Sequence, residues 1–132
     1  ATENRLSRFR RLNWDNRACV CVVVASSGYP GDYEKGKEIF GLEEADNLED
    51  IVVFHAGTKK LSVVPCLPAG RSCQLSDKYI TYGGRVLGVT GLGNTIKEAV
   101  DKTYQAVGKI SFEGMHYRRD IGKKAIEVTK TS

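Results

Sequence analysis

Hydrophobic residues along the chain gather into a few short segments, separated by glycines, prolines and charged stretches. The first segment, 19–25 (CVCVVVA), is apolar at every position and therefore predicts a strand that is covered on both faces. Further strands are expected at 51–56 (IVVFHA), 79–82 and 85–90. The pattern as a whole predicts a small sheet of short strands.

Apolar residues at spacings of three and four define the clearest element, a helix from about Ile96 to Lys109. Thr95 and Glu98 form a capping box at its start, which satisfies backbone amides that have no partner within the helix. Shorter helical segments are expected at 2–12 and at 121–128, the latter capped by Asp120, and 43–50 (EEADNLED) is expected to form a short helix or a turn. Strands packed against one long and one or two short helices make an α+β domain.

A specialised turn follows the first apolar segment, in GYPGDYEKGKEI (28–39). Pro30 fixes φ for the first corner of a turn, and Gly31 can adopt the positive φ that the second corner of a type II turn requires. Polar side chains surround the turn, but the residue types alone do not assign these side chains a chemical role. The simplest interpretation is that the turn only fixes the exit of the loop.

Composition limits the chain to one modest core, with 132 residues of which 41% are hydrophobic. The longest apolar run, 18–25, is too short to cross a membrane, and the N-terminal segment is polar and basic, unlike a signal peptide. We therefore expect a cytoplasmic protein without a membrane partner. Because the sequence begins with Ala1, we also expect it to be part of a longer or processed polypeptide.

The formal charge is +4, and much of the excess lies near the two ends of the chain, in 5–11 and 118–124. Such basic clusters can bind nucleic acid or a phosphorylated small molecule, or can be solvated helix faces. No aromatic RNA-binding motif accompanies them, so nucleic acid is not an expected partner. The cysteine pairs 19/21 and 66/73 lack the usual spacing of zinc ligands, so we expect no metal site, and without a secretory signal we expect reduced thiols.

Common enzyme motifs are missing from the sequence, which has no P-loop, nucleophile elbow or H-E-x-x-H. Arg85 is the most informative charged residue, because a strand that starts there places it on one face with Leu87 and Val89. An arginine among core residues needs a partner, and either a phosphate or a neighbouring carboxylate would suit its planar fork. Both alternatives stay open.

A second candidate is the segment 55–59 (HAGTK), in which a strand ends in a glycine, a hydroxyl and Lys59. These groups can donate hydrogen bonds to an anion, although an exposed hairpin end has the same composition. The residue types at 55–59 do not separate these two interpretations.

Several segments, in order, resemble one family: SSGYPGDYEKGKEI, VFHAGTK, GGRVLGVTGLGNTIKEAVDKTYQAV and KISFEGMHYRRDIGKKAI. Together they are similar to the C-terminal part of glycinamide ribonucleotide synthetases, also called phosphoribosylamine–glycine ligases. Residues 1–17 resemble the tail of the preceding ATP-grasp domain, and 18–132 the C-terminal domain. The family usually has a short hairpin where this chain has an unusual loop at 60–78.

The resemblance implies a small, mostly antiparallel sheet of the rudimentary hybrid-motif type, packed on a catalytic core. It also implies an ATP-dependent ligase that joins glycine to 5-phosphoribosylamine through glycyl phosphate, in de novo purine biosynthesis. In this family ATP and magnesium or manganese bind upstream, so the chain alone is expected to bind no cofactor and to be inactive. Its expected partners are the N-terminal and ATP-grasp domains of the same enzyme and the substrate or product, 5-phosphoribosylamine or glycinamide ribonucleotide.

The resemblance also assigns site residues. Arg85 and, by a weaker correspondence, Lys59 match an arginine and a lysine that hold the ribose 5-phosphate in related ligases. Four further residues are expected to line the shared cleft: Tyr29, Asp32, Tyr33 and His55. The alternative is a non-catalytic module that binds a phosphorylated ligand or a partner protein. An apolar patch left exposed by the first strand would favour the ligase, because an absent domain would cover it.

Overall fold

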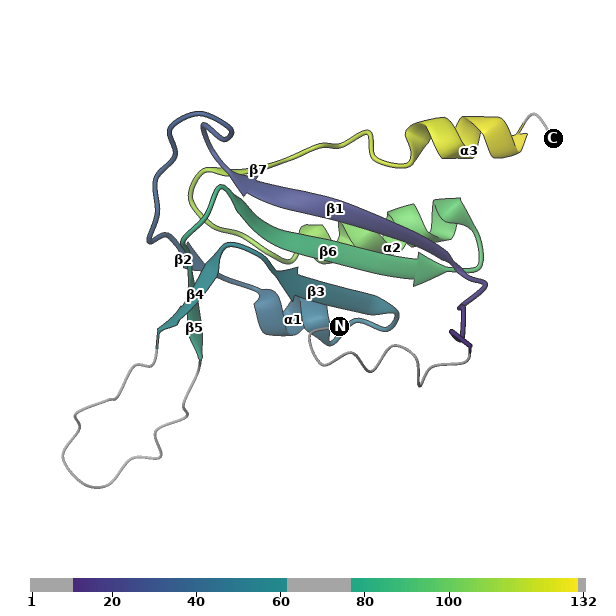
Figure 1. The fold of residues 1–132 in the computed structure, drawn as a ribbon, viewed down its shortest axis with the longest axis horizontal. Coiled ribbons are helices and arrows are strands. Elements are labelled where there is room, and N and C mark those ends of the chain that lie inside the picture. Colours follow the sequence, from purple (N-terminus) through teal and green to yellow (C-terminus); the bar gives the residue numbers. More distant parts are fainter. Residues whose placement is uncertain (1–10, 62–76, 131–132) are drawn as a thin grey trace, which may run out of the picture.

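Two antiparallel sheets organise the computed structural model, which describes residues 11–61 and 77–130 (Figure 1). The larger sheet has the strand order β3 (Ile51–His55), β6 (Arg85–Gly93), β1 (Ala18–Ser26) and β7 (Met115–Tyr117). The smaller sheet has the order β2 (Glu38–Ile39), β5 (Lys78–Thr81) and β4 (Thr58–Leu61). The smaller sheet lies at the end of the larger one where β1 ends and β6 begins.

Three helices are present in the described part of the chain: α1 (Leu42–Asp46), α2 (Ile96–Val107) and α3 (Lys123–Lys130). α2 packs across β1 and β6 and lies behind the larger sheet in Figure 1, with α1 against β3 and α3 beside α2. The expected α+β class, with antiparallel sheets, one long helix and two short ones, is confirmed. None of these helices is long and apolar enough to cross a membrane.

Helix α2 begins where the capping box predicts. The Thr95 hydroxyl accepts a hydrogen bond from the Glu98 amide at 3.2 Å, and the Glu98 carboxylate accepts one from the Asn94 amide at 3.0 Å. At the other end of the chain, α3 starts at Lys123 rather than Ile121. The expected helix at 2–12 lies almost wholly outside the described residues, as do Cys66 and Cys73.

The strands beside the expected loop at 60–78 reach further into that segment than the sequence indicated. β4 continues through Leu61 and β5 starts at Lys78, so their antiparallel pairing extends into the segment. Lys60 and Asp77 form an ion pair at 2.6 Å at this end of the smaller sheet. Residues 62–76 lie outside the described ranges.

The core lies between α2 and one face of the larger sheet. β1 and β6 pair in register, with Val22 opposite Val89 and Val20 opposite Gly91. Val22 and Val89 are fully buried and belong to one core cluster with Ala106 and Val107 of α2. Alternate residues of β1 therefore carry the packing, as expected for a strand with one buried face.

The other face of β1 is not covered, so the expected burial on both faces is wrong within the described residues. Cys19, Cys21 and Val23 are exposed, and Val23 lies beside Gly88 of β6, whose other partner is Phe54 of β3. Both helices that pack on the larger sheet lie on the opposite side. We call this surface the outer face, made up of Cys19, Cys21, Val23, Val52 and Phe54.

Close packing of α2 on β6 depends on Gly91. A Cβ at this position would collide with the Thr103 hydroxyl and come within 3.0 Å of the Ala99 carbonyl oxygen. Thr103 cannot move freely, because its buried hydroxyl donates to the carbonyl oxygens of Ala99 and Val20. Glycine is therefore a packing requirement here.

We expect Gly91→Ala to lower the free energy of unfolding by about 1–3 kcal/mol, the usual cost of overpacking a core. Gly88→Ala on the outer face is the matched control, because its nearest contact would be Cys21 Sγ at 3.4 Å. Urea unfolding of both variants measures the difference. Equal stabilities for the two variants would contradict this packing.

An ion-pair network joins the segment before β1 to α2. Asp50, at a positive φ of 62°, binds Arg17 at 2.6 Å and Lys102 at 2.8 Å. Arg17 also pairs with Asp15, and Lys102 with Glu98. Hydrogen bonds from Lys102 and then Arg17 lower the pKa of Asp50, and the Arg17 side chain lowers the pKa of Asp15 to about 2.

Folded-state pKa values below the unfolded ones mean that these carboxylates stabilise the fold above their unfolded pKa of about 4, and that this contribution is lost as the pH falls. Asp50→Asn, which tolerates the same positive φ, should therefore lose less stability than the wild type between about pH 5 and about pH 2. Asp101→Asn is the control, because Asp101 forms no ion pair in the described ranges. Urea unfolding across this pH range measures the loss. Equal losses of stability in the wild type, Asp50→Asn and Asp101→Asn would refute a stabilising role of the network.

Candidate functional site

Arg85 stands at the start of β6, where a bulge changes the alternation of the strand. Val24 pairs with Leu87 but Ala25 pairs with Arg85, so Val86 is an extra residue on β6. Val86 and Leu87 are both fully buried, whereas Arg85 is exposed. The expectation that Arg85 shares a face with Leu87 and Val89 is therefore wrong, because the bulge turns Arg85 outward.

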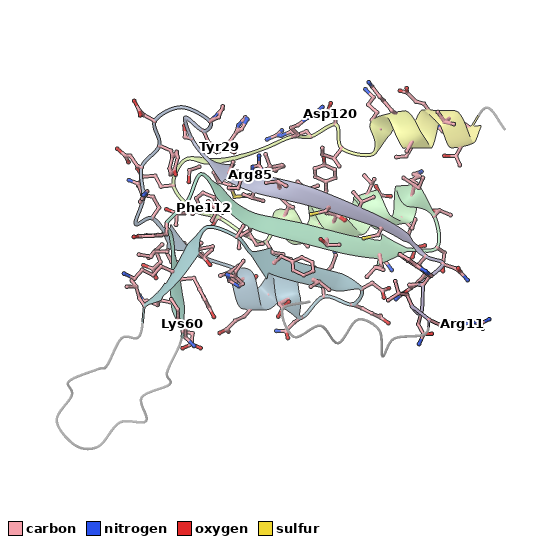
Figure 2. The ribbon with its side chains drawn as sticks, in the orientation of Figure 1. Arg11, Tyr29, Lys60, Arg85, Phe112 and Asp120 are labelled. Atoms are coloured by element: carbon pink, nitrogen blue, oxygen red, sulfur yellow. The ribbon has the colours of Figure 1, made fainter. Side chains whose placement is uncertain are left out.

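Tyr29, from the turn after β1, holds Arg85 in place. Arg85 Nε donates a hydrogen bond of 2.9 Å to the Tyr29 hydroxyl, and the guanidinium carbon lies 5.7 Å from the centre of the Tyr29 ring. The ring lies against Gly84, where a Cβ would overlap it. Figure 2 shows the two side chains together at the end of the sheet where β1 ends and β6 begins.

A series of ring contacts connects Arg85 with two lysines. Tyr29 and Tyr33 lie edge to face, 6.2 Å between ring centres, and Lys35 Nζ is 6.0 Å from the Tyr33 ring centre. The same Lys35 lies 5.1 Å from the ring centre of Tyr82, and Lys59 lies 5.6 Å from it on β4. We call this group the cation–tyrosine cluster: Tyr29, Tyr33, Lys35, Lys59, Tyr82 and Arg85.

The cluster brings together four residues predicted from the sequence and adds two that the sequence did not single out. Arg85, Lys59, Tyr29 and Tyr33 were expected, whereas Lys35 and Tyr82 were missed. Lys35 lies within the charged stretch 34–38, which gave no way to tell which charges would be paired. Only its place in the fold distinguishes Lys35 from the other charged residues of this stretch.

Lysines close to the cluster are paired with carboxylates. Lys37 binds Glu34 and Glu113, each at 2.9 Å, and both hydrogen bonds raise the pKa of Lys37. Lys78 pairs with Glu38 at 3.0 Å on the smaller sheet, as Lys60 does with Asp77.

The cations of the cluster differ from these paired lysines. Within residues 11–61 and 77–130, no carboxylate lies within 4 Å of a charged nitrogen of Lys35, Lys59 or Arg85. Aromatic faces attract such cations without neutralising them. The cluster is therefore a concentration of positive charge that an anion would stabilise, and no internal carboxylate satisfies Arg85 in this part of the chain.

The segment 55–59 contributes less than its composition allowed. The Ala56 and Gly57 amides both donate to the Val86 carbonyl oxygen at 3.1 Å, so neither is available to a ligand. The Thr58 hydroxyl is hydrogen-bonded to His55 Nδ1 at 2.9 Å. Lys59 is the remaining donor of this set.

His55 lies apart from the cluster. Its ring packs against Tyr79 with 4.6 Å between ring centres, and it borders a separate hollow of about 230 Å³ with Asp46 and Asp77. His55 and Lys59 are only four positions apart in sequence, but His55 ends β3 and packs on Tyr79, whereas Lys59 lies on β4 over the Tyr82 ring. His55 is therefore a weaker candidate for a shared cleft than the three residues of the turn.

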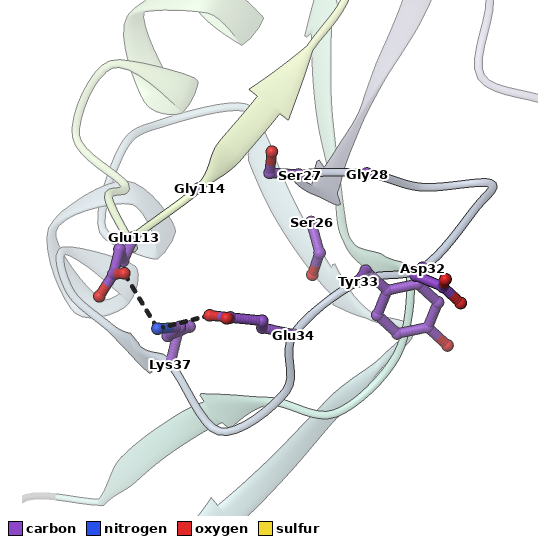
Figure 3. A pocket seen from close by; sticks show the side chains of 9 residues that line it. All are labelled: Ser26, Ser27, Gly28, Asp32, Tyr33, Glu34, Lys37, Glu113 and Gly114. Atoms are coloured by element: carbon purple, nitrogen blue, oxygen red, sulfur yellow. Dashed lines mark hydrogen bonds and ion pairs between the residues drawn. The ribbon is translucent and has the colours of Figure 1, made fainter.

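Asp32 and Tyr33 line an open cavity of about 550 Å³ beside the cluster, shown in Figure 3. Ser26 and Ser27 form part of its wall, and Lys37 lines it between two carboxylates. The turn that shapes the cavity differs from the expected one, because Gly28 has the positive φ, 90°, and Gly31 does not. Tyr33 belongs to both the cavity and the cluster.

Comparison with known families places this fold. The family described as "Phosphoribosylglycinamide synthetase, C domain" matches residues 19–124, most of the chain. The chain belongs to this family. The resemblance drawn from the sequence is thereby confirmed, and the cation–tyrosine cluster lies entirely within the matched residues of this synthetase C domain.

Relatives of this synthetase C domain carry consistent names. The phosphoribosylamine–glycine ligase of Synechocystis is 48% identical over 94% of the chain, which covers 26% of that protein. A bifunctional purine biosynthetic protein of Dictyostelium discoideum is 40% identical over 87% of the chain and 12% of its own length. The crystal structure of the Thermotoga maritima phosphoribosylamine–glycine ligase matches 77% of the chain and 21% of that protein, with 38% identity and a TM-score of 0.55. The synthetase C domain described here therefore spans about a quarter of the ligases that it matches.

Proposed function

We propose that the chain is the C-terminal domain of a cytoplasmic phosphoribosylamine–glycine ligase, with residues 1–17 forming the tail of a preceding ATP-grasp domain. The complete enzyme would use ATP to join glycine to 5-phosphoribosylamine in purine biosynthesis. The family match from residue 19 onward and the ligase names of the relatives support this assignment.

The role of this domain would be to hold the 5-phosphate of phosphoribosylamine or of the product, glycinamide ribonucleotide. Arg85 carries the proposal, because Tyr29 holds it by Nε while its two terminal nitrogens have no hydrogen-bond partner among the described residues. A guanidinium presented in this way can bind two phosphate oxygens at once. Lys59 would add a second charge from β4.

Chemistry at the glycine carboxylate would be supplied by other parts of the enzyme. ATP, with magnesium or manganese, would activate the carboxylate as an acyl phosphate. The residues of this domain would hold the sugar phosphate so that its amine meets the activated carbonyl carbon and displaces phosphate. Their contribution is positioning, which converts an encounter between two molecules into a reaction within one complex.

The exposed outer face is evidence for a further domain of the same enzyme that packs on it. Val23, Val52 and Phe54 are 47%, 41% and 58% exposed, although they form one apolar surface together with two cysteines. Three quarters of each ligase relative lies outside the part that this chain matches. We propose that this remaining part of the ligase covers the outer face, since neighbouring exposed apolar side chains on one face favour an interaction site.

A chimeric ligase tests the proposal. Replacing the matched C-terminal segment of the Synechocystis ligase with this chain should give an active enzyme that requires ATP, glycine and phosphoribosylamine. Arg85→Ala should raise KM for phosphoribosylamine about tenfold to a hundredfold, the usual effect of losing a charged hydrogen bond. Steady-state kinetics with each substrate varied in turn measures this effect.

Lys60→Ala is the control, because it removes a cation from the nearby strand β4 that is already paired with Asp77. KM for ATP should stay unchanged in both variants. A folded but inactive chimera would favour the non-catalytic module. An active chimera with an unchanged KM in Arg85→Ala would refute the phosphate role.

A further inference from the structure

We propose that Lys35 is a third phosphate-binding cation, held in position by Tyr82. This inference rests on the proposed function and extends its site by two residues. Lys35 lies outside any helix or strand, so the first question is what fixes its position in the fold.

Hydrogen bonds from the two residues that follow Lys35 anchor its segment to the end of β5. The Gly36 amide donates to the Thr81 carbonyl oxygen at 2.6 Å, and the Lys37 amide donates to the Thr81 hydroxyl at 3.1 Å. The Thr81 amide donates in return to the Lys37 carbonyl oxygen at 2.8 Å. Because Thr81 is fully buried, these bonds hold Lys35 next to Tyr82.

Tyr82 is fixed from its other side by the turn between β3 and β4. Its amide donates to the Gly57 carbonyl oxygen at 2.8 Å, two positions before Lys59 in the sequence. The Tyr82 ring therefore stands between the two lysine-bearing segments and contacts both ammonium groups, at 5.1 Å and 5.6 Å from its centre. The fold, rather than chance exposure, brings Lys35 and Lys59 to one ring.

Two positive charges on one ring repel each other, and no carboxylate of the described residues offsets either of them. The contrast with Lys37 is informative, because that lysine is two positions away and has two carboxylate partners. A phosphate dianion supplies the missing charge, and its several oxygens can accept from more than one ammonium group. Lys35, Lys59 and Arg85 together would more than balance it.

Binding of ribose 5-phosphate to the 132-residue chain, measured by isothermal titration calorimetry, tests this proposal. Lys35→Ala should raise Kd about tenfold, and Lys35→Arg should restore most of the affinity because it keeps the charge. Lys60→Ala removes one charge from a paired lysine and should leave Kd unchanged. Tyr82→Leu should weaken binding, whereas Tyr82→Phe should not, because the ring positions both lysines.

The two proposals fail in different ways. If Arg85→Ala weakens binding but Lys35→Ala matches Lys60→Ala, the role of Lys35 is refuted and the phosphate role of Arg85 stands. If neither variant weakens binding, or if the wild-type chain binds ribose no less tightly than ribose 5-phosphate, both are refuted. Absence of any binding at millimolar ribose 5-phosphate also refutes the proposed role of Lys35, since an exposed cluster of three cations should bind a dianion without the rest of the enzyme.

Discussion

The antiparallel pairing of β1 with β6 is the constraint on which the rest of the structure depends. On one side its alternate side chains meet α2, with Gly91 allowing the helix to approach. On the other side the same alternation produces the apolar outer face. At the end of the pairing, the bulge at Val86 turns Arg85 outward. One ladder thus sets the core, the proposed domain interface and the first cation of the proposed site.

Tyrosine side chains fix the positions of the cations in the proposed site. Arginine and lysine side chains are long and lose much conformational entropy when they are fixed, so an exposed cation seldom keeps one position without a partner. Carboxylates fix the neighbouring lysines but cancel their charge, whereas Tyr29 and Tyr82 contact Arg85, Lys35 and Lys59 and leave the charge available. This distinction between neutralised and merely positioned cations is what separates the proposed site from the rest of the charged surface among the described residues.

Much of the fold could be predicted from the sequence, because its signals are local. The capping box and apolar spacing located α2, and the apolar segments located β1, β3 and β6. Three features could not be predicted. The apolar run of β1 does not reveal whether its cover belongs to the same segment of chain, and the bulge beside Arg85 depends on pairing with β1. That none of the described carboxylates lies near Lys35 depends on contacts between residues far apart in the sequence. The family resemblance indicated Arg85 and Lys59 without showing what holds them.

The central claim is that the larger sheet is covered by α2 on one face and by the rest of the ligase on the other. The reactivity of the cysteine thiols on β1 tests this claim most directly. Cys19 and Cys21 are exposed on the outer face, and thiol labelling depends on access. With Cys66 and Cys73 replaced by serine, the labelling rate can be compared between the chain alone and the chimeric ligase. We predict rapid labelling of the chain and strong protection in the folded chimera. Equal rates in the two proteins would contradict the claim.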